Sequence, residues 1–218
     1  MSQKNSRAKS WEEATKPFRE AAKKSGFREE NLENLVSKNR RKNCNIKKKC
    51  DMEFLDVVNK KDEVVGKASK KDIYEKTLTH RIVHILIFNK EGEMALQLRS
   101  KSKDFTPSHW CTAAGGHVKS GETYEQAALR ECEEELGIKL DMNFLYKDLY
   151  TDFPRKGLKK FLGIFKATYE GPFEINPEEV EKIEFFNLEE IQKMVDKKEK
   201  LHPELLVLLE KHFGIKLS

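Results

Sequence analysis

Hydrophobic positions change their spacing along the chain and so indicate where strands and helices lie. Alternating apolar and polar residues predict strands, and apolar residues three and four positions apart predict helices. From residue 53 onward the predicted strands are 53–58, 63–67, 80–89, 93–99, 110–114, 144–153, 160–169 and 181–186. The predicted helices are 70–76, 124–136, 188–195 and 203–212. Strands interspersed with helices predict a domain of the α/β class.

The predicted helix 124–136 has strong signals at both ends. Thr123 and Gln126 have the spacing of a capping box, and Gly137 can adopt the left-handed conformation that ends many helices. At the helical period an apolar stripe predicts the buried face: Ala128, Leu129, Cys132 and Leu136. This face is expected to anchor the helix to the core.

Three glutamates lie beside that stripe, and we call Glu131, Glu134 and Glu135 the acid set. Their spacing brings the three carboxylates together within one helical turn. Such packing is electrostatically unfavourable unless a cation neutralises it, and Mg²⁺ prefers oxygen ligands of this kind. The glycine-bearing loop 115–121 lets backbone groups approach a ligand closely. We therefore predict a Mg²⁺ site, with Mn²⁺ as a substitute, where a bound phosphate shares the metal; a solvated acidic surface is the alternative.

The segment 116–138 fits the motif G-x5-E-x7-R-E-U-x-E-E-x-G-U, in which U is aliphatic. Its fixed positions are Gly116, Glu122, Arg130, Glu131, Glu134, Glu135, Gly137 and Ile138. Cys132 stands where the motif usually has Leu, Ile or Val, a mild departure because buried cysteine behaves as a small hydrophobe. The chain thus resembles the Nudix hydrolases. The resemblance implies an α/β/α sandwich with a mixed sheet, and cleavage of a diphosphate by water attack at phosphorus.

The same resemblance implies roles for individual residues. Metal ligands would be the Gly116 carbonyl and the carboxylates of Glu134 and Glu135, while Glu131 would be a ligand or the general base. Members of the family differ in which glutamate is the base, so this choice stays open. Arg130 would orient a motif carboxylate, with a surface ion pair as the alternative.

Candidates for substrate binding surround the motif. The loop contributes Gly115, Gly116 and His117, and the preceding strands contribute His80 and Arg81. Further basic candidates for phosphate contacts are Arg99, Lys101, Lys103, Arg155, Lys156, Lys159 and Lys160. For most of these cations the alternative is a solvated surface.

Beyond the motif, the chain resembles the branch of the superfamily related to type I isopentenyl-diphosphate isomerase. His80 and His117 fall at histidine positions of that pattern. The isomerase needs a cysteine where this chain has Gly115, and Cys111 lies four residues earlier. Because this chain also keeps the whole acid set, hydrolysis of a nucleoside diphosphate derivative is preferred. An isomerase of prenyl diphosphates and a non-catalytic nucleotide- or RNA-binding module are the alternatives.

Charge divides the chain near residue 50. Residues 1–50 carry 15 Lys and Arg against 6 Asp and Glu, which leaves a net charge of −4 on residues 51–218 out of the total of +5. We expect a basic, partly helical, partly mobile extension at 1–50 and the enzymatic domain at 51–218. The basic stretch 38–49 can attract nucleic acid, but without interleaved aromatic residues a solvated linker is preferred.

The cysteines and the apolar runs of the sequence indicate the cellular compartment of the protein. Cys44 and Cys50 lack a second pair at zinc spacing, and four cysteines in 218 residues do not suggest a disulfide framework. No apolar run approaches the roughly 20 residues that span a bilayer, and the start does not resemble a secretory signal. We therefore expect a cytoplasmic enzyme, not membrane-bound, with a small-molecule diphosphate as its partner; homodimerisation is common in such proteins.

Overall fold

A computed structural model describes residues 53–152 and 155–217 of the chain. The basic, partly helical extension predicted for 1–50, the stretch 38–49 and the domain boundary near residue 50 lie outside the described residues, as does residue 153, the predicted end of one strand.

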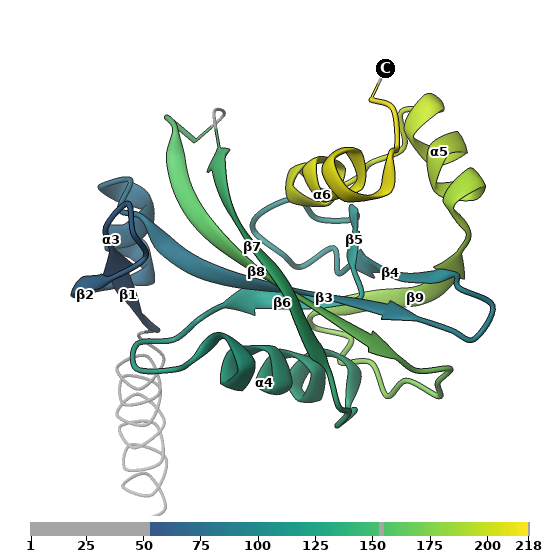
Figure 1. Cartoon of the computed structure of the whole chain (residues 1–218), viewed down its shortest axis with the longest axis horizontal. Coiled ribbons are helices and arrows are strands. Elements are labelled where there is room, and N and C mark those ends of the chain that lie inside the picture. Colours follow the sequence, from purple (N-terminus) through teal and green to yellow (C-terminus); the bar gives the residue numbers. More distant parts are fainter. Residues whose placement is uncertain (1–52, 153–154, 218) are drawn as a thin grey trace, which may run out of the picture. The chain divides into compact units, whose positions relative to one another are not determined.

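A seven-stranded sheet forms the centre of the domain (Figure 1). Its strands are β3 (His80–Phe88), β4 (Met94–Arg99), β5 (Trp110–Thr112), β6 (Ala114–His117), β7 (Asn143–Asp152), β8 (Leu158–Thr168) and β9 (Val180–Phe186). A separate two-stranded sheet consists of β1 (Phe54–Val58) and β2 (Val64–Ser69). The helices are α3 (Lys70–Glu75), α4 (Tyr124–Leu136), α5 (Leu188–Asp196) and α6 (Pro203–Phe213).

The large sheet is mixed, as predicted. Its main path is β5-β4-β3-β8-β7, with β6 paired to β3 and β9 paired to β4. The pair β3 and β8 is parallel, and the other pairs are antiparallel. The mixed α/β architecture expected from the sequence is therefore confirmed.

Strand β3 lies at the centre and supplies side chains to both faces of the sheet. Val83 and Ile85 belong to the core beneath α4, whereas Ile82 and Leu86 belong to the core beneath α5 and α6. This alternation is the period of two that a strand buried on both faces requires. Figure 1 shows α4 on one side of the sheet and α6 on the other, so the helices form the two outer layers.

The predicted strand 110–114 is in fact two strands. Residues Trp110–Thr112 pair with β4, and residues Ala114–His117 pair with β3. Because the chain changes its partner strand at Ala113, one hydrophobic run contains two elements. The sequence pattern reports burial and cannot report this change of partner.

One residue of the predicted apolar stripe is misplaced. Ala128, Cys132 and Leu136 are buried as expected, but Leu129 is 45% exposed. Ala127, Glu131 and Glu135 take buried positions on α4. The buried face is therefore rotated toward two members of the acid set.

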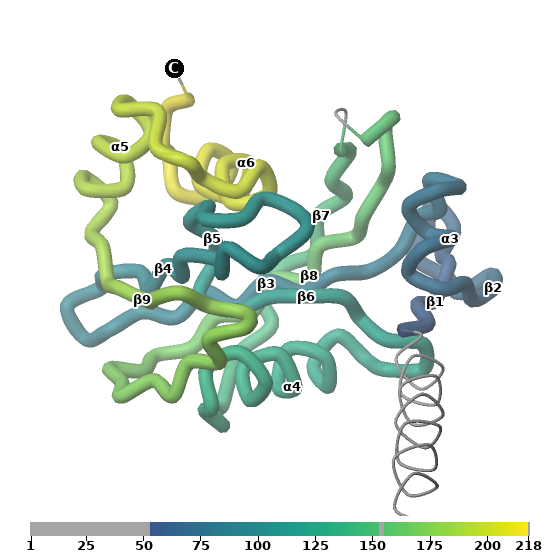
Figure 2. The backbone as a smooth tube through the Cα atoms, turned by 180° about the vertical axis from the view of Figure 1, so that it is seen from behind, coloured from purple at the N-terminus to yellow at the C-terminus, as the bar shows by residue number. Residues whose placement is uncertain are grey.

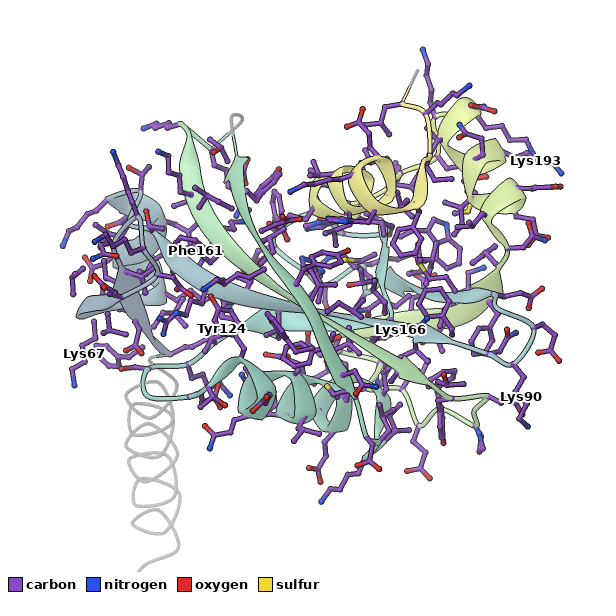
Figure 3. All side chains as sticks on the ribbon, viewed as in Figure 1. Lys67, Lys90, Tyr124, Phe161, Lys166 and Lys193 are labelled. Carbon is purple, nitrogen blue, oxygen red and sulfur yellow. The ribbon has the colours of Figure 1, made fainter. Side chains whose placement is uncertain are left out.

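The small sheet is attached to the domain through Asp62 in its turn. The Asp62 carboxylate accepts hydrogen bonds from Arg81 Nε at 2.6 Å, Tyr124 OH at 3.0 Å and Lys147 Nζ at 2.6 Å. Lys147 Nζ also lies 5.9 Å and 5.5 Å from the ring centres of Tyr124 and Phe161, both labelled in Figure 3. Asp62 thus joins the turn of the small sheet to α4, β3 and β7.

None of the helices in residues 53–152 and 155–217 is both long and apolar enough to cross a membrane.

Candidate active site

Helix α4 positions the acid set, and its two ends are fixed locally. The Thr123 side chain accepts from the Gln126 backbone N–H while the Gln126 side chain accepts from the Thr123 N–H, which completes the predicted capping box. Gly137 ends the helix in the left-handed conformation with φ of 66°. The helix therefore runs over Tyr124–Leu136, the predicted range.

Arg130 joins the motif loop to the acid set. Its guanidinium donates to both oxygens of Glu122 at 2.8 and 2.9 Å and to the His117 carbonyl at 2.9 Å. The same guanidinium donates to Glu131 at 2.6 Å and to Glu134 at 3.1 Å. Burial opposes its charge, but Glu122 and Glu131 outweigh burial and raise the Arg130 pKa. With 17% of its side chain exposed, Arg130 is a partly buried hub and not a surface ion pair.

Glu122 closes the loop that precedes α4. It accepts from the Lys119 backbone N–H at 2.9 Å as well as from Arg130. These bonds connect the first turn of the loop to the middle of the helix. Glu122 therefore holds the loop against α4.

Glu131 lies directly against the backbone of Gly116. A Cβ atom added to Gly116 would come 2.3 Å from Glu131 Oε1, a distance that no side chain tolerates. Burial raises the pKa of the Glu131 carboxyl, although Arg130 opposes this rise. The glycine at 116 is thus explained by the close approach of the Glu131 carboxylate to its backbone. It is not explained by a left-handed backbone conformation, which Gly116 does not adopt.

Glu135 is buried between the helix and the sheet. Its Oε2 atom accepts from Gln97 Nε2 at 2.9 Å and from the Gly115 backbone N–H at 3.2 Å. Burial, together with the charge of Glu131, raises the pKa of Glu135 to about 7. A cation beside this buried carboxylate would therefore stabilise its ionised form.

Glu134, the third member of the acid set, is more open. Half of its side chain is exposed, and it pairs with Arg130 at 3.1 Å and with Lys119 Nζ at 3.6 Å. It lies on the same turn as Glu131 and shares Arg130 with it. The acid set therefore consists of two buried carboxylates and one that faces solvent.

The donor chemistry of this region fits Mg²⁺. In the described part of the chain, no three Asp, Glu, His or Cys side chains are already gathered as metal ligands, because Arg130 binds two carboxylates and Gln97 binds the third. Yet four carboxylates, Glu122 included, face two cations, Arg130 and Lys119, which leaves a charge of −2 when all are ionised. A divalent ion with oxygen ligands would neutralise that charge.

Sequence reasoning missed Gln97 and did not single out Lys103 and Glu179 together. Lys103 pairs with Glu179, and burial lowers the pKa of Lys103 while the Glu135 charge opposes the fall. Lys103 therefore lies near the acid set, and Glu179 is brought there with it. The only local signal for Gln97 is a polar residue at an inward position of β4.

The predicted substrate-binding arginines make contacts within the protein. Arg81 is bound to Asp62, and Arg99 donates to the carbonyls of Thr106 at 3.2 Å and Phe105 at 3.1 Å. His80 and His117 lie together with ring centres 5.5 Å apart, and His117 Nε2 is 2.8 Å from Tyr74 OH. The roles of these residues toward a substrate stay predictions.

A second polar group, which we call the histidine–lysine cluster, lies on the α6 side of the sheet. Its members are His84, Asp152, Lys160, His202 and Glu204, all buried. Glu204 binds Lys160 Nζ at 2.6 Å and His84 Nε2 at 3.1 Å. Burial alone would raise the Glu204 pKa, but the His84 hydrogen bond and the Lys160 charge hold that pKa well below its usual range.

Comparison with known sequences gives a consistent result. A family model described as NUDIX domain matches residues 78–208. The chain is 34% identical over 139 residues to an uncharacterized Nudix hydrolase, PA4841, of Pseudomonas aeruginosa, covering 64% of this chain and 81% of that protein. It is 32% identical over 144 residues to an uncharacterized Nudix hydrolase, YfcD, of Escherichia coli strain K12, covering 66% of this chain and 79% of that one.

A solved structure agrees with these sequences. The crystal structure of DR0079 from Deinococcus radiodurans matches with a TM-score of 0.64 and 28% sequence identity, covering 73% of this chain and 98% of that chain. The likeness therefore extends over nearly the whole of that protein.

Proposed function

Since this chain belongs to the Nudix hydrolases, which act on diphosphate linkages, we propose that it is a Mg²⁺-dependent hydrolase of a nucleoside diphosphate derivative. The observation that carries the proposal is that Glu135 and Glu131 lie against the Gly115 and Gly116 backbone. With Glu134 and Glu122 they leave a local charge of −2 after Arg130 and Lys119 are counted. A complete and uncompensated set of oxygen ligands is costly to keep in a protein that binds no cation.

Each motif residue then has a task. The Gly116 carbonyl, Glu131, Glu134 and Glu135 would hold the ion, which when bound would neutralise charge on the diphosphate. Arg130 orients Glu131 and Glu134 through its bonds of 2.6 and 3.1 Å. Burial raises the pKa of both Glu131 and Glu135, so the choice of the carboxylate that accepts a proton from the attacking water lies between these two.

Two histidines lie together near the end of β6. His117 directly follows Gly116 and stacks with His80, whose Nε2 is buried without a partner among the described residues. Because His80 Nδ1 faces the Leu78 carbonyl at 3.1 Å, Nδ1 carries the proton and Nε2 is an acceptor. His80 is fully buried, so the preference for hydrolysis over the isomerisation of a prenyl diphosphate rests on the intact acid set.

The experiment is release of phosphate or nucleoside monophosphate from a panel of diphosphates with Mg²⁺, with isopentenyl diphosphate included. We expect wild-type cleavage of nucleoside diphosphate derivatives. Glu134→Gln should keep the fold and lose about 100-fold or more of the rate, by analogy with the loss of one stabilising group in an active site. Glu133→Gln is the matched control, because Glu133 lies on the same helix and, among the described residues, its side chain pairs with exposed Lys139 alone, at 3.0 Å.

The panel also separates the alternatives. A folded Glu134→Gln variant with the wild-type rate would remove the proposed site. Allylic product from isopentenyl diphosphate without hydrolysis would support the isomerase, although Gly115 has no side chain to move a proton. Nucleic-acid binding through residues 38–49 and homodimerisation stay predictions; RNA binding at low salt that weakens steeply with added salt would support the first.

A further inference from the structure

Gln97 is a fully buried polar residue on the face of the sheet that α4 covers. It is 2% exposed and lies in the middle of β4, paired with Cys111 of β5 and Ile183 of β9. Ala95, two residues earlier on the same face, belongs to the apolar core beneath α4. An apolar residue would therefore fit this position, and the amide must have another reason to be there.

One end of the amide is bound to the acid set. Gln97 Nε2 donates to Glu135 Oε2 at 2.9 Å, and the Gly115 N–H donates to the same oxygen. An ionised carboxylate only accepts hydrogen bonds, so the NH₂ end of the amide must face Glu135. This arrangement fixes the Glu135 side chain through one oxygen.

The other end of the amide has no partner. Among residues 53–152 and 155–217, Gln97 Oε1 is one of three buried side-chain atoms that make no hydrogen bond. Leaving a buried acceptor unpaired destabilises the fold. The two buried carboxylates nearby cannot donate when ionised, and the Lys103 ammonium pairs with Glu179 and makes no hydrogen bond to this oxygen. Since no donor within residues 53–152 and 155–217 reaches Gln97 Oε1, a ligand is a natural source of one.

A hydrated divalent ion supplies such a donor. Mg²⁺ loses its water reluctantly and keeps several water molecules when bound to carboxylates. We propose that Gln97 is a positioning residue of the metal site: Oε1 accepts from a water molecule of the hydrated ion while Nε2 holds Glu135. This inference rests on the proposed function, because it needs the ion at the acid set.

The amide group suits this task because it donates at one end and accepts at the other. Methionine has a similar shape but neither group, and asparagine keeps both groups on a shorter side chain. Outer partners of metal sites typically contribute about 10- to 100-fold to metal affinity. The three side chains therefore make a graded test at one position.

The experiment measures Mn²⁺ binding to the full chain by electron paramagnetic resonance, without substrate. We expect Gln97→Met to weaken binding about 10- to 100-fold. The Gln97→Met variant should also show a smaller metal-induced rise in melting temperature than wild type. A ligand that binds more weakly stabilises the folded state less at the same concentration. Gln192→Met is the matched control, because Gln192 is on α5 and bonds Asp196 and the Lys216 carbonyl.

The outcomes separate this inference from the proposed function. Wild-type Mn²⁺ affinity in folded Gln97→Met would overturn the role of Gln97 and leave the metal site standing. Absence of binding in wild type and in Gln192→Met would overturn the metal site itself, and this inference with it. If Gln97→Met does not fold, Gln97→Asn decides, because this shorter amide cannot reach Glu135 and the water of the ion together: a loss of about tenfold or more supports the role of Gln97, and a smaller loss overturns it.

Discussion

The two faces of the sheet carry buried polar clusters of opposite character. On the α4 face, the acid set together with Glu122 retains a charge of −2 after Arg130 and Lys119 are counted and all four carboxylates are ionised, and an amide oxygen next to it is unpaired among the described residues. On the α6 face, the histidine–lysine cluster pairs each carboxylate with a cation: Lys160 Nζ lies 2.6 Å from Glu204 and 3.6 Å from Asp152. Figure 2 shows β3 and β6 running between these two faces.

This difference separates stability from function. A cluster whose charges are paired within the protein is not further stabilised by a bound ion, so we infer that it stabilises the packing of the elements that carry it. A cluster with uncompensated charge lowers the stability of the isolated protein and becomes favourable only when a cation binds. Changes on the α6 face should therefore be seen in unfolding, and changes on the α4 face in metal binding and turnover.

The largest expected effect is on the α6 face. Lys160→Met would remove the buried cation that Asp152 and Glu204 share and leave them only His84 and Arg155, which should destabilise the fold by about 3 kcal/mol. Urea unfolding measures this change. The control is Lys159→Met at the exposed neighbouring position, expected within about 0.5 kcal/mol of wild type. If both variants were equally stable, the histidine–lysine cluster would not contribute to stability as we infer.

The next effect is on the α4 face. In Gly116→Ala the added Cβ must displace the Glu131 carboxylate, since the two atoms would be 2.3 Å apart. A displacement on the order of 1 Å in an active site can cost about 100-fold in rate. Steady-state turnover on the substrate from the diphosphate panel checks this. Gly66→Ala is the control, because a Cβ there meets nothing within 4 Å; a similar loss in that variant would point to a general effect.

The smallest effect is a change in how stability depends on pH. Burial lowers the pKa of His202 to about 3, whereas an unfolded histidine titrates near 6.5. Below about pH 6.5 the unfolded chain therefore takes up a proton that the folded chain refuses, so stability falls as the pH falls. His202→Asn keeps a capping acceptor for α6 and should reduce this slope by about 1 kcal/mol per pH unit.

Denaturant unfolding of wild type and His202→Asn at several values between pH 4.5 and 6.5 gives both slopes. An unaltered slope would show that His202 is protonated in the folded protein.

Local signals predicted the parts of the site that lie close together in the chain. The range of α4 follows from Thr123, Gln126 and Gly137, which act within one turn of each helix end. The motif residues follow from spacing on one loop and one helix. Their neighbours in space could not be found in this way.

The contacts that were missed join distant parts of the chain. Glu204 is 44 residues from Lys160 and 120 residues from His84, and periodicity contains no information on such pairs. Gln97 is 38 residues from Glu135. Arg81 shows the same limit: its charge suggested a phosphate contact, which stays a prediction, and its partner in the fold, the turn residue Asp62, lies 19 residues away in the sequence. Charge along the sequence does not reveal which partner the fold supplies.

Neighbouring positions of strand β6 face opposite sides of the sheet. Gly115 and Gly116 meet Glu135 and Glu131 through backbone and Cα, and the next residue, His117, stacks with His80. An insertion or deletion of one residue would exchange the faces, so that an imidazole would stand where no Cβ fits. Mutational drift in this strand is thus confined to substitutions. Insertions and deletions that change specificity are expected in connecting loops such as 101–109, because a change in loop length does not alter the pairing register of β6.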